Sequence, residues 1–91
     1  MGRSWKQHQR RFRYRKMTAI EFSAALDHLE MKVDAFAYIS GAREDRVERW
    51  KRGEEDIPHS ALALCVACTV PGVLALLMKT ADHYAEWEPD S

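Results

Sequence analysis

The segment from Phe36 to Gly53 restricts the fold of this chain more than any other stretch. Its residues suit a short helix, a tight turn at Gly41, a second short helix and a stop at Gly53. Val47 and Trp50 lie three residues apart, so a helix places both apolar side chains on one face. Glycine is the residue that most readily adopts the left-handed backbone of sharp turns and helix ends. The segment therefore predicts two packed helices joined by a glycine turn, a helix–turn–helix.

Charged side chains cover the other face of the second predicted helix, residues 44–51, and the positions beside it. They are Arg43, Glu44, Asp45, Arg46, Glu48, Arg49 and Arg52. Asp45 and Arg49 are four residues apart, a spacing at which opposite charges on a helix form an ion pair. We expect this pair to orient the Arg49 guanidinium. The apolar inner face would pack on the core and leave the charged face to contact a partner.

The same segment resembles the Cro/CI-type (XRE) helix-turn-helix family, whose pattern is roughly L-A-x-x-L-G-V-S-x-x-T-V-S-R-W-E-x-G. Phe36-Ala37 match the L-A pair, and Val47, Arg49-Trp50 and Gly53 match the V, R-W and final G. The family usually has a phosphate-binding Gln, an apolar residue, a capping Ser and a Glu where this chain has Val33, Ser40, Arg43 and Lys51. The resemblance covers about residues 17–77.

The resemblance implies a sequence-specific DNA-binding transcriptional regulator, most often a repressor, of bacteria or a phage. Its recognition helix, residues 44–51, would enter the major groove of double-stranded DNA together with the seven charged residues named above. There Arg can bond guanine, and Glu or Asp can accept a hydrogen bond from cytosine. Members of the family commonly bind inverted repeats as homodimers, so a second copy of the chain is an expected partner.

Two other functions stay open. Three acids lie on the recognition face, which suits a helix-turn-helix fold that binds another protein and has little or no specific affinity for DNA. The basic N-terminal segment alone could instead bind nucleic acid without sequence preference. A DNA-binding regulator would lose binding when Arg46 or Arg49 is replaced by alanine, whereas a protein-binding module would depend on its apolar C-terminal surface.

Residues 1–16 form a basic arm. Seven of the 14 basic residues and none of the 14 acidic residues lie there, which leaves a formal charge of −7 on the remainder. Such an arm is either a solvated, flexible tail or a segment that follows DNA phosphates or enters a minor groove. In the second case the phosphate contacts are expected from Arg10, Arg11, Arg13, Arg15 and Lys16.

The sequence predicts an all-α fold, a compact five-helix bundle with the helix–turn–helix at its centre, in one domain of residues 17–88. Apolar residues make up 46% of the chain, and no alternating pattern typical of strands occurs. Thr18 and Glu21 have the spacing of a capping box, and Met17 and Phe22 that of a hydrophobic staple. A helix should therefore start at Thr18 and end near Glu30.

An uncharged run covers residues 61–78. This is the length of a short membrane span, but Pro71-Gly72 in its middle would interrupt the helix. We predict two helices instead, Ser60–Val70 and Pro71–Trp87, and no association with a membrane. The second helix has more apolar surface than a small core covers, so we expect it to form the dimer interface. The expected interface residues are Val73, Leu76, Leu77 and Tyr84.

No residue pattern indicates an enzyme, a cofactor, a metal site or a small-molecule ligand. Cys65 and Cys68 form a C-x-x-C pair, but no paired histidines complete a zinc site, so we expect both to be core residues. The contiguous acids Glu54, Glu55 and Asp56 fall in a predicted loop and should be solvated. No apolar segment follows the basic arm, unlike in a secretory signal, so a cytoplasmic protein with reduced thiols is expected.

Overall fold

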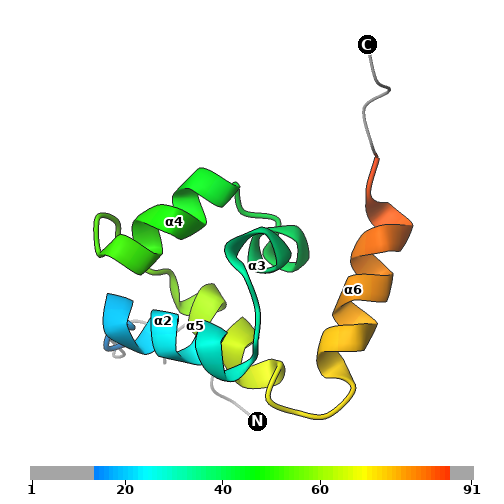
Figure 1. Ribbon diagram of the computed structural model, residues 1–91, viewed down its shortest axis with the longest axis horizontal. Coiled ribbons are helices and arrows are strands. Elements are labelled where there is room, and N and C mark those ends of the chain that lie inside the picture. The colour runs from blue at the N-terminus through cyan, green and yellow to red at the C-terminus, as the bar shows by residue number, and fades with distance from the viewer. Residues whose placement is uncertain (1–13, 87–91) are drawn as a thin grey trace, which may run out of the picture.

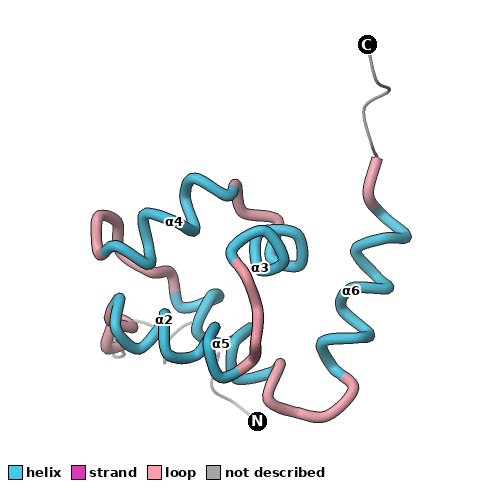
Figure 2. Tube along the Cα trace, viewed as in Figure 1, coloured by secondary structure: helices cyan, strands magenta, loops and turns pink. Residues whose placement is uncertain are grey.

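Five α-helices are present in the part of the chain that the computed structural model describes, residues 14–86 (Figures 1 and 2). With the labels of Figure 1 they are α2 (Ala19–His28), α3 (Val33–Ser40), α4 (Glu44–Arg52), α5 (His59–Ala67) and α6 (Val73–Tyr84). No strand occurs between residues 14 and 86. The prediction of an all-α fold with five helices is confirmed. Most of the basic arm, residues 1–13, lies outside the described part of the chain.

Helix α2 begins with the predicted capping box. The Thr18 hydroxyl oxygen accepts from the Glu21 amide at 3.1 Å, and the Thr18 amide donates to Glu21 Oε1 at 2.9 Å. The helix ends at His28, earlier than predicted, because Glu30 adopts a left-handed backbone with φ +54°. The Met31 amide then donates to the Leu26 carbonyl at 2.9 Å, which closes the end of the helix as a Schellman motif does.

The turn between α3 and α4 follows the prediction. Gly41 closes α3 with φ +80°, and its amide donates to the Ala37 carbonyl at 2.9 Å. Gly53 closes α4 with φ +74°. An L side chain is strained in this backbone region, so both positions favour glycine. Three residues, 41–43, separate the two helices, which therefore form a helix–turn–helix.

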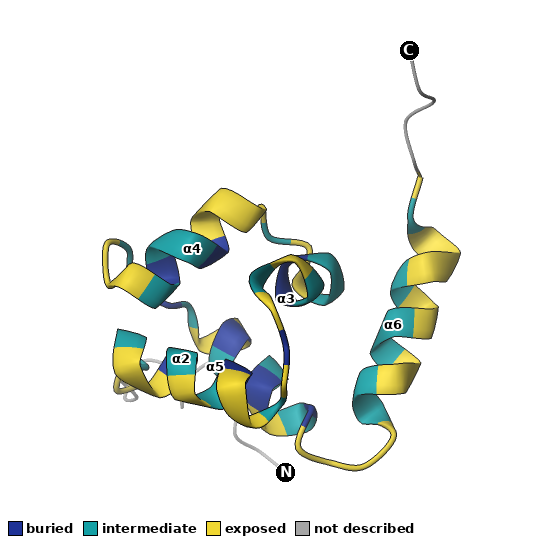
Figure 3. Cartoon of the chain, in the orientation of Figure 1, coloured by how far each residue is buried: buried dark blue, intermediate teal, exposed yellow. Residues whose placement is uncertain are grey.

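Three aromatic rings from three different helices meet at the centre of the core. Phe22 of α2, Phe36 of α3 and Trp50 of α4 are each at most 2% exposed. Every pair packs edge to face, with centroid distances of 5.2 Å (Phe22–Phe36), 5.9 Å (Phe22–Trp50) and 6.4 Å (Phe36–Trp50). Edge-to-face contacts stabilise such pairs beyond the area that they bury. This aromatic trio fixes α4 against α2 and α3 and leaves its other face outside (Figure 3).

The uncharged run 61–78 forms two helices, as predicted, but their bounds differ. Helix α5 ends at Ala67 and α6 begins at Val73, so Pro71 lies in the connecting turn and not in the first turn of α6. Gly72, with φ +88°, directs the chain into α6. Between residues 14 and 86, no helix combines the length and the apolar character that a membrane crossing requires.

Helix α6 stands to one side of the other four helices (Figure 1) and contacts mainly α3. None of its residues is fully buried. Leu74 and Leu77 pack against the edge of the core, whereas Leu76 and Tyr84 are 62% and 77% exposed. The helix therefore has an inner side that touches the domain and an outer side that nothing in the described chain covers. The outer side carries Leu76 and Tyr84 together with the exposed polar residues Lys79, Thr80 and His83.

Candidate functional site

The outer face of α4 is charged but internally paired. Asp45 Oδ2 lies 3.2 Å from Arg49 Nη1, which confirms the predicted ion pair, and Glu48 Oε2 lies 3.9 Å from Arg52 Nη1. In both pairs the acid precedes the base by one helical turn, the favourable order along a helix. In each pair the acid and the base neutralise each other's charge on the exposed side of the helix. This face therefore presents polar groups at fixed positions and carries no strong positive field.

Glu55 departs from the prediction that the loop acids are solvated. Its side chain is only 29% exposed, and its carboxylate accepts hydrogen bonds from Arg46 Nε, from Arg49 Nε at 3.1 Å and from Trp50 Nε1 at 3.2 Å. The Arg46 guanidinium also lies over the Trp50 ring, 5.3 Å from its centroid. Glu54 is exposed, as expected, and lies 3.3 Å from Arg52. We call Glu55, Arg46, Arg49 and Trp50 the Glu55 cluster.

One signal in the sequence could have indicated this cluster. A buried tryptophan usually needs an acceptor for its indole N–H. Trp50 was expected in the core, and three acids follow it within six residues. The chain reverses at Gly53, which brings Glu55 back alongside the last turns of α4.

The Glu55 cluster predicts acid sensitivity. The hydrogen bonds from Arg46 and then Arg49 lower the pKa of Glu55 below its ordinary value of 4.5. Because the pKa is lower in the folded than in the unfolded protein, the ionised carboxylate stabilises the fold above about pH 4.5, and this contribution is lost as the pH falls through the folded-state pKa. Melting temperatures measured between about pH 7 and pH 3 should fall less for Glu55→Gln than for the wild type. Equal pH dependence of the two proteins would contradict this assignment.

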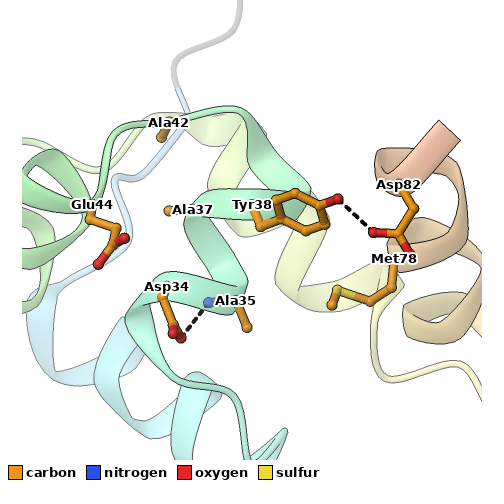
Figure 4. Close-up of a pocket in the computed structure, with 8 residues that line it drawn as sticks. All are labelled: Asp34, Ala35, Ala37, Tyr38, Ala42, Glu44, Met78 and Asp82. Carbon is orange, nitrogen blue, oxygen red and sulfur yellow. Dashed lines mark hydrogen bonds between the residues drawn. The ribbon is translucent and has the colours of Figure 1, made fainter. Parts of the chain in front are cut away.

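At the N-terminal end of α4 lie the other two residues expected to contact DNA. Arg43 precedes the helix, is 84% exposed and has its Nε 3.1 Å from Asp45 Oδ1. Glu44 faces a groove of about 690 Å³ between α3 and α6 (Figure 4). Asp34, Tyr38 and Asp82 also line this groove, and the Tyr38 hydroxyl donates to Asp82 Oδ1. Glu44 thus lines this groove at the start of α4, across α3 from Met78 and Asp82 of α6.

The last residues of the basic arm lie along the domain. Arg15 Nη2 is 3.3 Å from Glu21 Oε2, and Lys16 Nζ is 2.6 Å from Asp56 Oδ2. Tyr14 stacks on His59 at the start of α5, with ring centroids 4.0 Å apart. Two of the five expected phosphate contacts are therefore engaged with acids of the domain. The other three, Arg10, Arg11 and Arg13, lie outside the described residues.

The residues expected at the dimer interface divide between the two sides of α6. Leu76 and Tyr84 are exposed on its outer side. Val73 and Leu77 are half-buried, and Leu77 packs against the core of the same chain. Two further apolar residues are exposed shortly before α6 in the sequence. They are Val66, near the end of α5 and 59% exposed, and Val70, in the following turn and 54% exposed.

Both cysteines are buried free thiols, as predicted. Cys65 and Cys68 are 3% and 7% exposed, and burial raises the pKa of Cys65 to about 11. Because the thiolate is the reactive form, iodoacetamide should modify the folded protein slowly and the urea-unfolded protein quickly. Mass spectrometry at neutral pH would measure this, and rapid modification of the folded protein would contradict it. Among residues 14–86, no three His, Cys, Asp or Glu side chains lie together in a way that could hold a metal ion.

Comparison with known proteins identifies no relative. No protein-family model matches the chain, and no curated protein or solved structure matches it either. The resemblance of residues 36–53 to the Cro/CI-type family therefore stays a prediction from the sequence.

Proposed function

We propose that this protein is a sequence-specific DNA-binding transcriptional regulator, in the simplest case a repressor, that places α4 in the major groove. The observation that carries the proposal is the Glu55 cluster, in which one carboxylate holds two arginines of α4. An exposed helix with arginines in preset positions suits direct readout of base edges. Such readout depends on hydrogen-bond geometry more than on net charge, so it is compatible with the paired charges of α4.

Contacts to the DNA backbone would come from the edges of α4. Arg43 precedes the helix and Arg52 ends it, and their side chains are 84% and 56% exposed. Arginine at these places can bind phosphates and so fix the position of the helix in the groove. The basic arm would add further phosphate contacts, and a cytoplasmic location would give the protein access to DNA.

A homodimer completes the proposal. A helix of nine residues reads only a few base pairs, so specific binding to a genome needs two such helices. The outer side of α6, where Leu76 and Tyr84 are exposed, would provide the surface for a second copy. In a two-fold dimer the recognition helices would contact half-sites of an inverted repeat about 34 Å apart.

The experiment that tests this function is a selection from a random-sequence DNA pool at two salt concentrations. It uses the full chain and a chain that begins at Met17, so that the contribution of the arm is measured separately. We expect both proteins to enrich an inverted repeat, and the full chain to bind it more tightly with a steeper salt dependence. Binding without enrichment of any sequence, lost when the arm is removed, would overturn the proposal.

A second function is favoured by the same ion pairs. Asp45–Arg49 and Glu48–Arg52 leave the outer face of α4 without the excess positive charge that attracts phosphates. A protein-interaction module could use this face, or the apolar side of α6, to bind another protein. Arg49→Ala would abolish specific DNA binding by a regulator, whereas a module of this kind would show no specific DNA binding to lose.

A further inference from the structure

The arginines of the Glu55 cluster use the same atom of their guanidinium groups. Arg46 donates through Nε to Glu55 Oε2, and Arg49 donates through Nε to Oε1 at 3.1 Å. The Trp50 indole N–H shares Oε2 with Arg46 at 3.2 Å. Glu55 does not belong to α4, because it lies in the loop that follows Gly53. A residue outside the recognition helix therefore sets the orientation of two arginines on it.

Arg46 and Arg49 differ in how many of their terminal nitrogens, Nη1 and Nη2, already donate a hydrogen bond within residues 14–86. The guanidinium of Arg46 lies over the Trp50 ring, and its hydrogen bonds within residues 14–86 use Nε, so both Nη groups are available to a ligand. Arg49 also donates from Nη1 to Asp45 at 3.2 Å, which leaves Nη2. Arg46 can thus make a two-donor, end-on contact, whereas Arg49 can donate one further hydrogen bond from Nη2.

Guanine is the base that matches a two-donor arginine. Its O6 and N7 atoms are adjacent acceptors in the major groove, and Arg bonded to both is the commonest specific protein–DNA contact. A phosphate can also accept two hydrogen bonds from one arginine, but only a base contact produces a sequence preference, which selection from random DNA measures. We infer that Glu55 is a positioning residue that holds Arg46 for an end-on bidentate contact with guanine, an inference that rests on the proposed DNA-binding function.

The charge of Glu55 separates this role from simple support of the fold. A carboxylate near DNA repels phosphates, so its removal should strengthen binding to any sequence. Glutamine keeps one acceptor oxygen and replaces the other with an NH₂ group that cannot accept, so Arg46 and Arg49 can no longer both be held and discrimination by Arg46 should weaken. Glu55→Gln is therefore expected to raise non-specific affinity and to lower selectivity. A residue that only supported Trp50 would change stability and leave the base preference as it was.

Glu54→Gln is the matched control. Glu54 is the neighbouring loop residue, loses the same charge on substitution, and pairs with Arg52 and not with the two arginines of the cluster. In the selection from random DNA, both variants should bind non-specific DNA a few-fold more tightly than the wild type. Only Glu55→Gln should lose the preference for guanine at one position of each half-site, by about tenfold or more.

Arg46→Lys provides a second variant that keeps the positive charge but lacks Nε and the planar fork. It should lose the guanine preference at the same position, and the double variant with Glu55→Gln should lose no more than either single variant. An unchanged preference in Glu55→Gln or in Arg46→Lys would overturn the inference while the wild-type selection still supported the proposed function. If the wild type enriched no sequence, the proposed function and the inference would both fail. Circular dichroism establishes that the variants are folded, and if Glu55→Gln does not fold, Arg46→Lys decides.

Discussion

Replacement of Phe36 by alanine is expected to lower the free energy of unfolding by about 3–5 kcal/mol, the usual loss for a buried aromatic residue. Phe36 is fully buried and packs edge to face on both other members of the aromatic trio, Phe22 and Trp50. Since small domains are stable by only about 5–15 kcal/mol, the variant should be at the edge of folding. The substitution would also release α3 from α2 and α4, because the trio joins these helices.

Urea-induced unfolding followed by circular dichroism would measure this effect. Ile20→Ala is the control, since Ile20 lies on α2 but is 83% exposed, and a surface substitution of this kind changes stability by about 0.5 kcal/mol or less. A loss below about 1 kcal/mol for Phe36→Ala would mean that the aromatic trio does not form the centre of the core.

Leu76→Asp is expected to convert a homodimer into a monomer. Leu76 lies on the outer side of α6 and is 62% exposed, so the aspartate would be solvated in the monomer but buried without a partner in a dimer. The monomer should keep its fold and should bind an inverted repeat about 100-fold more weakly, because the second half-site no longer contributes to the same binding event.

Analytical ultracentrifugation and titration of a full and a half operator would test this prediction. Ile20→Asp is the matched control. It also introduces an aspartate in place of an exposed apolar residue, but on α2 and not on α6. We expect Ile20→Asp to remain a dimer. Equal mass and equal DNA affinity for Leu76→Asp and the wild type would show that α6 is not the contact between copies.

Much of the fold could be predicted from the sequence because its determinants are local. The capping box of Thr18 and Glu21 and the glycines at 41 and 53 each involve residues only a few positions apart. The predicted helix start at Pro71 was wrong, because the positive φ angle of Gly72 determined where α6 begins. The end of α2 was predicted only approximately, near Glu30, because the positive φ angle of Glu30 set it at His28. Glutamate rarely adopts a positive φ angle, so a glutamate in the sequence does not indicate that a helix ends there.

The candidate site was predicted less well because its contacts are not local. Helical periodicity predicts which residues lie on the outer face of α4, and it also predicted the Asp45–Arg49 ion pair. The capture of Arg46 and Arg49 by Glu55 depends on how the loop after Gly53 folds back. The Tyr38–Asp82 hydrogen bond joins residues 44 positions apart and depends on where α6 packs. Periodicity contains no information on either.

The position of α6 gives this small protein two levels of stability. Each of the helices α2–α5 contributes buried residues to the core, but α6 contributes none and is joined to α5 by the turn at residues 68–72. Backbone amides of α6 should therefore exchange with deuterium through local opening, while those of α2–α4 exchange through global unfolding. A second copy seated on α6 would have to dissociate before either kind of opening, so a higher protein concentration would slow both processes by mass action.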